Sequence, residues 1–421
     1  MDIKSIIKEQ REELEKIDKE EHLIRREHLD LAKKMLKHPN ILAIIGIRRC
    51  GKSIFSYMLA KDERTGYINF DDERLVGLKG EDLNRILESF YEMYKDIDYI
   101  ILDEIQNVEH WELFANRLRR TKRVILTGSN SKLLSGELST HLTGRHLDFH
   151  LMPFSFREFL LKKEFKESSP YTTKEAANIM NLLEEYIQTG GFPETYKFGR
   201  QMALRIYEDI LTKDILLRHN ISKIEEFKKL AKYLITNSSQ EMSYSKLSNI
   251  LGIKHISTIS NWVGYLEDSF LIFRLERFDF KLKQQFIAPK KIYCIDTGMT
   301  NGIGFRFSDN KGRAIENLVA IELQRRKQID EELEVYYWKD HQQNEVDFVL
   351  KKGKRIVQLI QVSYATELSD INQREINALL KARNELKCKN LVVITWNYEG
   401  KKDEMIFIPL WKWLLGYNVQ S

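Results

Sequence analysis

The chain has 421 residues, more than one hydrophobic core usually holds, so we expect two or three domains. Hydrophobic residues make up 43% and charged residues 31%, which excludes a wholly disordered chain, and the net charge of +5 permits nucleic-acid binding without requiring it. The longest apolar run, residues 41–45, is too short to cross a bilayer, and the amino terminus lacks the apolar segment of a signal peptide. The 3 cysteines have no metal or redox spacing. We therefore expect a cytoplasmic protein with no membrane partner.

Residues 1–38 predict a charged helical segment with a ragged apolar period, which suits either a partner-binding arm or a plain surface helix. Apolar strands then alternate with helices, which predicts a parallel sheet covered on both faces over residues 39–165. The expected strands are 41–45, 67–70, 99–102 and 124–127. The fold class is therefore α/β, beginning with a parallel sheet that helices cover on both faces.

Residues 166–285 are predicted to be mostly helical. Helices at 244–251 and 256–266, separated by a tight turn at Gly252 and followed by a strand at 270–278, are typical of a winged helix-turn-helix. Residues 286–421 are predicted to form a compact mixed α/β domain. Its expected helices are 313–326 and 368–386, and its expected strands are 335–338, 346–350, 356–362 and a closing strand at 391–395.

The segment after the first strand matches the phosphate-binding pattern G-x-x-x-x-G-K-S and opens a predicted helix, which is the context that this motif requires. Its backbone N–H groups and the helix amino terminus favour phosphate. We expect Lys52 to contact the β- and γ-phosphates of ATP and Ser53 to hold Mg²⁺. The expected nucleotide-binding residues are Gly46, Ile47, Arg48, Arg49, Cys50, Gly51, Lys52, Ser53 and Ile54.

Three of these positions leave alternatives open. Arg48 and Arg49 fit either neutralisation of phosphate charge or contact with nucleic acid. Cys50 fits either a small loop residue or a reactive thiol at a helix amino terminus.

An acidic pair ends the strand at 99–102. Asp103 is placed to orient Mg²⁺, and Glu104 can act as the general base that polarises the attacking water. This pair favours ATP hydrolysis over a GTPase switch, in which a glutamine usually positions the water.

The next strand leads into Ser129 and Asn130, which fit either sensing of the γ-phosphate or capping of a loop. Arg145 is a candidate arginine finger acting within the chain or, in a homo-oligomer, across subunits. A surface salt bridge is the alternative role for Arg145.

Taken in order, these motifs resemble a family of prokaryotic P-loop ATPases of the AAA type that carry a carboxyl-terminal domain of unknown function. The resemblance implies an ATPase module, a winged helix, and a last domain like the PD-(D/E)xK nucleases. The matching stretches are 46–53, 102–106, 126–130, 144–145, 153–159 and 190–194.

The last domain is expected to lack part of a nuclease centre. Such a centre needs two or three carboxylates on one Mg²⁺ and a lysine that stabilises the charged transition state. Glu316 and Asp347 stand where the first two acids belong, as ligands of a second metal site. The third motif has Gln361 and Ser363 in place of Glu and Lys, and no lysine lies nearby on the same strand face. A nuclease-like fold kept for contact with DNA or protein is therefore the favoured interpretation.

In a winged helix the second helix enters the major groove. The expected core side of this helix is Ile256, Ile259, Trp262 and Leu266, and the candidate DNA contacts are Lys254, His255, Ser257, Thr258, Ser260 and Asn261. A helix-turn-helix used only for packing is the alternative.

Three functions remain in view. The first is Mg²⁺-dependent ATP hydrolysis coupled to the binding or remodelling of DNA. The second is a metal-dependent DNA nuclease regulated by ATP, and the third is a nucleotide-controlled scaffold that does no work on DNA.

Overall fold

The computed structural model describes residues 2–21, 23–129, 142–166, 168, 170–199, 201–304 and 311–416. The chain forms two compact units. The amino-terminal unit comprises Met1–Pro153 with Asp268–Phe270, and the carboxyl-terminal unit comprises Phe154–Glu267 with Leu271–Ser421. Within the described ranges no helix has both the length and the apolar character that a membrane span requires.

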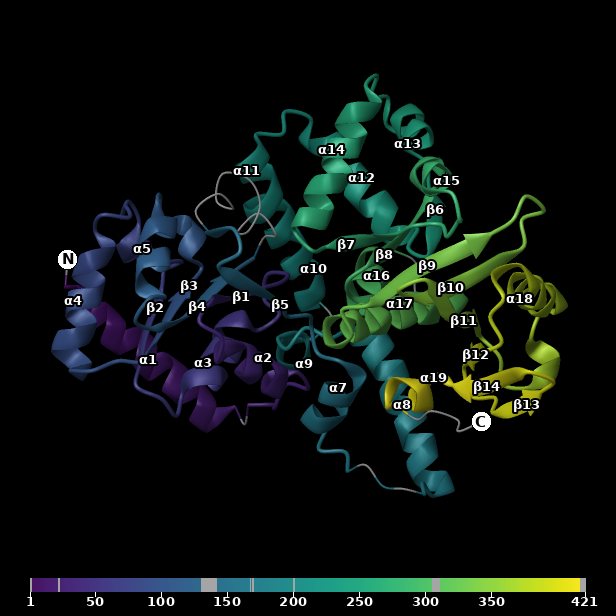
Figure 1. The fold of residues 1–421 in the computed structure, drawn as a ribbon, viewed down its shortest axis with the longest axis horizontal. Coiled ribbons are helices and arrows are strands. Elements are labelled where there is room, and N and C mark those ends of the chain that lie inside the picture. The colour runs from purple at the N-terminus through teal and green to yellow at the C-terminus, as the bar shows by residue number, and fades with distance from the viewer. Residues whose placement is uncertain are drawn as a thin grey trace. The chain divides into compact units, whose positions relative to one another are not determined.

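The amino-terminal unit is built on a five-stranded sheet in the order β2-β3-β4-β1-β5, and every neighbouring pair is parallel (Figure 1). This confirms the predicted α/β sheet, and the first strand has the predicted bounds. The strands are β1 (Ile41–Ile45), β2 (Thr65–Asn69), β3 (Tyr99–Asp103), β4 (Arg123–Gly128) and β5 (His146–His150). The helices are α1 (Ile3–Glu20), α2 (Leu29–Leu36), α3 (Lys52–Ala60), η1 (Glu73–Leu75), α4 (Leu83–Tyr94), η2 (Ile105–Asn107) and α5 (Trp111–Leu118).

Helix α1 is part of this unit's core, although the sequence predicted a solvated helix or a partner-binding arm. Ile3, Ile6 and Ile7 are buried in the same apolar cluster as residues of β1, β2 and β3. The side chain of Gln10 bonds both backbone groups of Asn69, at 3.1 Å to the carbonyl oxygen and 2.9 Å from the N–H. The apolar stripe of α1 therefore covers β2 and α4, with which this helix is in contact.

Strand β5 was not predicted, and its position explains why. It lies at the edge of the sheet, where it pairs with β1 alone. Its residues alternate in character, and only Phe149 among them is buried. An edge strand with polar side chains lacks the continuous apolar run that identified the four inner strands.

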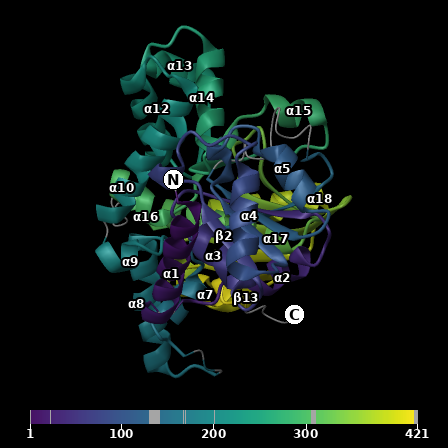
Figure 2. The same ribbon diagram turned by 90° about the vertical axis from the view of Figure 1, so that its left-hand side faces the viewer.

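The first part of the carboxyl-terminal unit is helical, as predicted, and carries a small antiparallel sheet in the order β6-β8-β7. Helices α12, α13 and α14 lie together in both ribbon views (Figures 1 and 2). The predicted order of helix, tight turn, helix and strand is present. The helices are α7 (Phe156–Lys162), α8 (Thr173–Thr189), α9 (Thr195–Phe198), α10 (Gln201–Asp209), the π-helix η4 (Ile210–Leu216), α11 (Leu217–His219), α12 (Ile224–Thr236), α13 (Tyr244–Leu251), α14 (Ile256–Asp268) and α15 (Leu282–Ile287). The strands are β6 (Gln240–Met242), β7 (Ile272–Leu275) and β8 (Lys290–Cys294).

The second part is a six-stranded mixed sheet in the order β13-β14-β12-β11-β10-β9. The predicted closing strand β12 is not the last, because β13, β14 and α19 follow it. The strands are β9 (Leu333–Lys339), β10 (Glu345–Lys352), β11 (Arg355–Ser363), β12 (Leu391–Thr395), β13 (Gly400–Lys402) and β14 (Met405–Pro409). The helices are α16 (Thr297–Ile303), α17 (Lys311–Ile329), η6 (Leu368–Asp370), α18 (Gln373–Leu386) and α19 (Leu410–Leu414).

Candidate functional site

The loop between β1 and α3 has the backbone that a phosphate cradle needs. A side chain at Gly46 would place its Cβ 2.1 Å from the carbonyl oxygen of Leu151, so only glycine fits there. Gly51 has a φ of +97°, in the left-handed region that favours glycine, and α3 begins at the next residue, Lys52. The first N–H groups of a helix have no acceptor within the helix, so the start of α3 suits an anion.

Lys52 lies inside this loop and is 5% exposed. Its Nζ donates to the carbonyl oxygens of Gly46 and Ile47 at 3.2 and 3.3 Å, and it lies 3.6 Å from Oε1 of Glu104. The ammonium is thus held by the loop carbonyls on one side and the Glu104 carboxylate on the other.

Asp103 ends β3 and is fully buried. Burial raises the pKa of its carboxyl group, and the charge of Glu104 adds to the rise, while hydrogen bonds from Ser53, Thr127 and Tyr67 oppose it. The hydroxyl of Tyr67 donates to Oδ2 at 2.7 Å, and that of Thr127 donates to Oδ1. The structure therefore brings Ser53 and Asp103 together, and this hydroxyl and carboxylate fit a Mg²⁺ ion.

Glu104 follows Asp103 in the left-handed conformation, with a φ of 51°, which is unusual for a residue that carries a side chain. Its N–H donates to Oγ1 of Thr127 at 2.9 Å, which fixes this turn of the backbone. Its carboxylate accepts from Nε2 of Gln106 and faces the ammonium of Lys52. The two predicted acids therefore have different surroundings, one buried in hydroxyl groups and one beside the P-loop lysine.

Ser129 follows β4, whose last residue, Gly128, pairs with Ile45 at the end of β1. This register places Ser129 at the same edge of the sheet as the P-loop, and Ser129 is buried. Asn130 lies outside the described residues.

The structure does not bring Arg145 to the P-loop. Its carbonyl accepts from the N–H of Ile41 at 3.0 Å, so Arg145 lies beside the first residue of β1, whereas the P-loop follows the last. The five-residue strand separates the two sites by roughly 15 Å at about 3.3 Å per residue. This placement opposes an arginine finger acting within the chain.

The remaining P-loop residues take different positions. Arg48 is partly buried, with Nη1 3.9 Å from Oδ2 of Asp71, and Arg49 is exposed. Cys50 is fully buried, and burial raises the pKa of its thiol. Its Sγ lies 3.2 Å from the carbonyl oxygen of Leu151, so Cys50 is a small packed residue rather than a reactive thiol. Ile54 is partly buried in the first turn of α3.

Four residues of the site were missed by the sequence reasoning. Tyr67 and Thr127 bond Asp103, and Gln106 bonds Glu104. Arg26 is buried and donates to the carbonyl oxygens of Cys50 and Met152, at 3.2 and 2.6 Å, which braces the P-loop. Thr127 and Gln106 lie in motif stretches and could have been found there, but no local pattern marks Tyr67 or Arg26.

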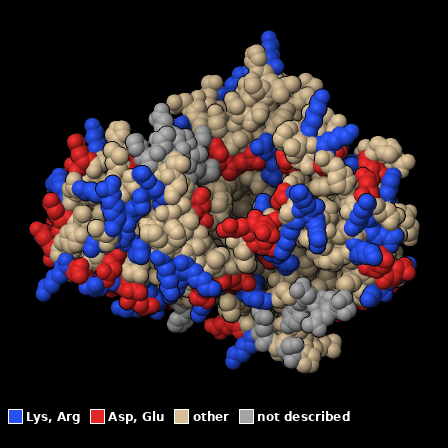
Figure 3. All heavy atoms as spheres, viewed as in Figure 1, with Lys and Arg blue, Asp and Glu red and all other residues tan. Residues whose placement is uncertain are grey.

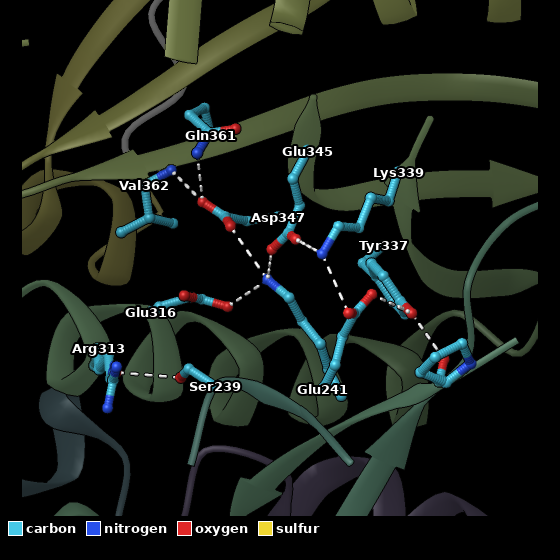
Figure 4. Close-up of polar contacts among 12 residues, drawn as sticks. Ser239, Glu241, Arg313, Glu316, Tyr337, Lys339, Glu345, Asp347, Gln361 and Val362 are labelled. Carbon is cyan, nitrogen blue, oxygen red and sulfur yellow. Dashed lines mark hydrogen bonds and ion pairs between the residues drawn. The ribbon is translucent and has the colours of Figure 1, made fainter. Parts of the chain in front are cut away.

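The carboxyl-terminal unit brings Glu316 of α17 and Asp347 of β10 together around one side chain, that of Lys291 on β8 (Figure 4). No lysine was expected near the third motif, because none lies suitably on β11 or in the turn before it. Lys291 reaches this site from β8 instead. Gln361 does lie at this site, and its Nε2 donates to Oδ2 of Asp347 at 2.7 Å. Burial raises the pKa of Glu316 and that of Asp347, and the charge of Lys291 opposes the rise in both.

Helix α14 and the turn before it expose most of the side chains that were proposed as DNA contacts. Lys254, His255, Ser257 and Asn261 are exposed, and Thr258 and Ser260 are partly so, whereas Ile259, Trp262 and Leu266 are buried as expected. Ile256 was predicted to face the core and is instead 50% exposed, at the first residue of α14. Figure 3 shows the surface around α13 and α14 as mostly uncharged.

The parallel sheet, the P-loop and the acidic pair together define a P-loop ATPase. In agreement, residues 38–160 match the model of an AAA domain, residues 180–309 match a domain of unknown function (DUF8612), and residues 311–413 match another (DUF4143). The uncharacterised protein MJ1544 of Methanocaldococcus jannaschii is 39% identical over 407 residues, which cover 90% of this chain and 89% of that protein. The chain therefore belongs to the family of AAA-type P-loop ATPases that carry carboxyl-terminal domains of unknown function.

Other relatives are more distant. An uncharacterised protein of Haemophilus influenzae is 28% identical over 394 residues, covering 88% of this chain and 94% of that one. Among solved structures, the Walker-type ATPase PABY2304 of Pyrococcus abyssi is 14% identical, with a TM-score of 0.46, and covers 68% of this chain and 97% of that chain. AMPPCP-bound DnaA of Aquifex aeolicus is 18% identical, with a TM-score of 0.26, and covers 57% and 86% of the two chains.

Proposed function

We propose that this protein hydrolyses ATP with Mg²⁺ and couples hydrolysis to the binding or remodelling of DNA in the cytoplasm. The observation that carries the ATPase part is the arrangement of Lys52, Ser53, Asp103 and Glu104 at one edge of the sheet. The DNA part has the weaker support, which is the exposed polar face at the start of α14.

Each residue has a role that its surroundings suggest. Lys52 exchanges the carbonyls of Gly46 and Ile47 for phosphate oxygens when ATP enters, because a phosphate offers the ammonium full negative charge. Ser53 and Asp103 would hold Mg²⁺, which would neutralise charge on the phosphates. Asp103 remains anionic in that state because the added positive charge opposes the effect of burial on its pKa.

Glu104 takes the proton of the attacking water. It is 15% exposed by its side chain, and it faces the P-loop rather than β4. Gln106 acts as a positioning residue, since its amide holds one oxygen of the Glu104 carboxylate and leaves the other directed to the loop. Ser129 and Asn130 remain candidates for sensing the γ-phosphate from the neighbouring strand.

The experiment that tests this function compares ATP turnover alone, with single-stranded DNA and with double-stranded DNA, using Glu104→Gln as the hydrolysis-deficient control. We expect Mg²⁺-dependent turnover that DNA stimulates. A rate of ATP turnover that neither type of DNA changes, together with assembly that depends on ATP, would favour the scaffold function instead. The same assay is repeated on a variant in which Lys254 and Asn261 are replaced with Ala. This variant should show less stimulation by DNA and unchanged basal turnover.

A further inference from the structure

A buried lysine holds together the acidic residues of the carboxyl-terminal unit. Lys291, the second residue of β8, is 2% exposed. Its Nζ lies 2.9 Å from Oε1 of Glu316, 2.6 Å from Oε1 of Glu345 and 3.2 Å from Oδ1 of Asp347, three of the acids that Figure 4 labels. We call these three carboxylates the acidic centre. An ammonium group has three N–H donors, and each carboxylate of the acidic centre has one of them within reach.

Other donors engage the same carboxylates. Oδ2 of Asp347 accepts from Nε2 of Gln361 at 2.7 Å and from the N–H of Val362 at 3.0 Å. The hydroxyl of Tyr293 donates to Oε1 of Glu316 at 2.8 Å. Oε2 of Glu345 lies 3.1 Å from Nζ of Lys339. The Tyr293 bond thus engages the Glu316 oxygen that faces Lys291, whereas the bonds to Asp347 and Glu345 engage the second oxygen of each carboxylate.

A Mg²⁺ ion does not fit this arrangement. It needs carboxylate oxygens at about 2.0–2.1 Å in an octahedron, and the point on which the three carboxylates converge is filled by Nζ of Lys291. Among the residues that the structure describes, no group of three or more His, Cys, Asp or Glu side chains is placed to hold a metal ion. The Mg²⁺ centre that the resemblance to PD-(D/E)xK nucleases implies is thus at odds with the side chains present.

The backbone that carries Lys291 is fixed within the same unit. Strand β8 is the middle strand of its sheet, between β6 and β7. The N–H of Cys294 donates to Oδ1 of Asn317 at 2.9 Å, and Nδ2 of Asn317 donates to the carbonyl of Cys294 at 3.0 Å. These bonds join β8 to α17, the helix that carries Glu316. The strand that carries Lys291 and the helix that carries Glu316 are therefore joined by hydrogen bonds as well as by charge.

The electrostatics keep this lysine positively charged. Burial alone would lower the pKa of Lys291, but the surrounding carboxylates outweigh burial and hold that pKa well above its ordinary value. Glu345 has a lowered pKa despite its burial, because Lys291 and Lys339 stabilise its charge. Removal of the Lys291 ammonium would leave buried carboxylates without a counter-charge.

We propose that Nζ of Lys291 is the resident cation of the acidic centre and stands where a nuclease of this type would hold its metal. The centre is then an ion-pair site that joins β8 to α17 and β10 without any metal. Loss of the ammonium, with the carboxylates kept, should convert the centre into a divalent-cation site.

The test measures Mn²⁺ binding to the full, nucleotide-free chain by equilibrium dialysis, with thermal unfolding in Mn²⁺ and in EDTA beside it, since carboxylate sites accept Mn²⁺ readily. Mn²⁺ binding by wild type should not change when Asp347 is replaced with Asn. The melting temperature of wild type should be the same in both buffers. Lys291→Met should bind one Mn²⁺ per chain and melt at a higher temperature in Mn²⁺ than in EDTA. Asp347→Asn added to Lys291→Met should remove that binding.

Lys290→Met is the matched control, because Lys290 is the adjacent residue of β8 and pairs with Glu276 outside the acidic centre. It should resemble wild type in both measurements. Mn²⁺ binding by wild type that disappears in Asp347→Asn would overturn the proposal, as would a folded Lys291→Met that binds none. If Lys291→Met does not fold, the comparison of wild type with Asp347→Asn decides the question by itself.

Discussion

At the scale of single residues, the last residue of β3 and the acid that follows it have different surroundings, which fit the two roles proposed for them. Asp103 is fully buried among the hydroxyls of Tyr67 and Thr127, so it cannot exchange protons readily with solvent. Glu104 is turned away from it by a left-handed backbone and faces Lys52. A metal ligand gains from such rigid support, whereas a general base needs access to a water molecule.

Glu104→Gln should bind ATP with near wild-type affinity and hydrolyse it about 10²–10⁴-fold more slowly, because the amide cannot accept the proton of the attacking water. Single-turnover hydrolysis and nucleotide binding, measured on the same preparation, separate these two effects. Lys52→Ala is the contrasting variant, since it removes the ammonium that contacts phosphate and should weaken binding itself. Wild-type turnover by Glu104→Gln would show that the base has been assigned wrongly.

Some residues of the site could be predicted from the sequence, and others could not. The P-loop and the acidic pair could be predicted because each is a contiguous motif in a defined strand context. Tyr67, Arg26 and Lys291 could not, because each reaches its partners through tertiary packing across 24 or more residues of chain. Lys291 in particular belongs to a different sheet from Asp347, so no spacing rule connects them.

At the scale of elements, buried strands and capped helices were predicted most accurately. Strands β1 and β12 and helix α13 have the predicted bounds, since β1 and β12 are continuous apolar runs and α13 begins at an N-cap serine and ends at a glycine. The polar edge strand β5 and the three-residue strand β13 were missed because neither has an apolar run. Sheet order required the structure, because pairing is a tertiary property.

The turn that ends α8 supplies a test of packing between elements. Gly190 has a φ of +78°, and a Cβ there would lie 2.2 Å from Oδ1 of Asp296, the N-cap residue of α16. The N–H of Gly191 donates to Oδ2 of the same carboxylate at 2.6 Å. The two glycines therefore wrap the chain around Asp296, which accounts for this part of the motif at 190–194.

Gly190→Ala should destabilise the chain by about 1–3 kcal/mol from backbone strain, with the contact against Asp296 adding to the loss. Gly312→Ala in α17 is the control, because a Cβ there meets no atom of the described residues within 4 Å, and alanine should be neutral or stabilising by up to about 1 kcal/mol. Urea unfolding midpoints of the two variants and wild type provide the measurement. Equal midpoints for Gly190→Ala and wild type would contradict this account of the turn.

At the scale of the whole molecule, the position of Arg145 bears on assembly. It lies at the opposite end of β1 from the P-loop, so any action on ATP has to come from another subunit. We expect Arg145→Ala to bind ATP but to hydrolyse it poorly, since arginine fingers contribute about 10³–10⁵-fold to rate. Mixing it with Glu104→Gln should restore part of the activity, because some interfaces then combine an intact Glu104 with an intact Arg145. Mixtures that stay inactive, with a monomer by light scattering at every ATP concentration, would contradict an action of Arg145 across subunits.

The carboxyl-terminal unit provides the last prediction, which concerns DNA cleavage. A PD-(D/E)xK nuclease needs carboxylates free to bind Mg²⁺ and a lysine free to stabilise the charge that grows on the scissile phosphate. Here Glu316 and Asp347 are paired with Lys291, and that lysine is occupied by the same carboxylates. Gln361 remains neutral, so it supplies no third acidic ligand.

Wild type should therefore leave supercoiled and single-stranded DNA intact in Mg²⁺ or Mn²⁺. Ser363→Lys alone should be an incomplete rescue, because a lysine at that position adds positive charge without freeing Asp347 from Lys291 or giving Gln361 a negative charge. Loss of one positioned charge stabiliser costs about 10²–10³-fold in rate. Here Nζ of Lys291 also occupies the position that the metal would need. The measurement is conversion of supercoiled plasmid by wild type beside Asp347→Ala. Robust nicking by wild type that vanishes in Asp347→Ala would make the ATP-regulated nuclease the leading function, because only a working metal centre would depend on that carboxylate.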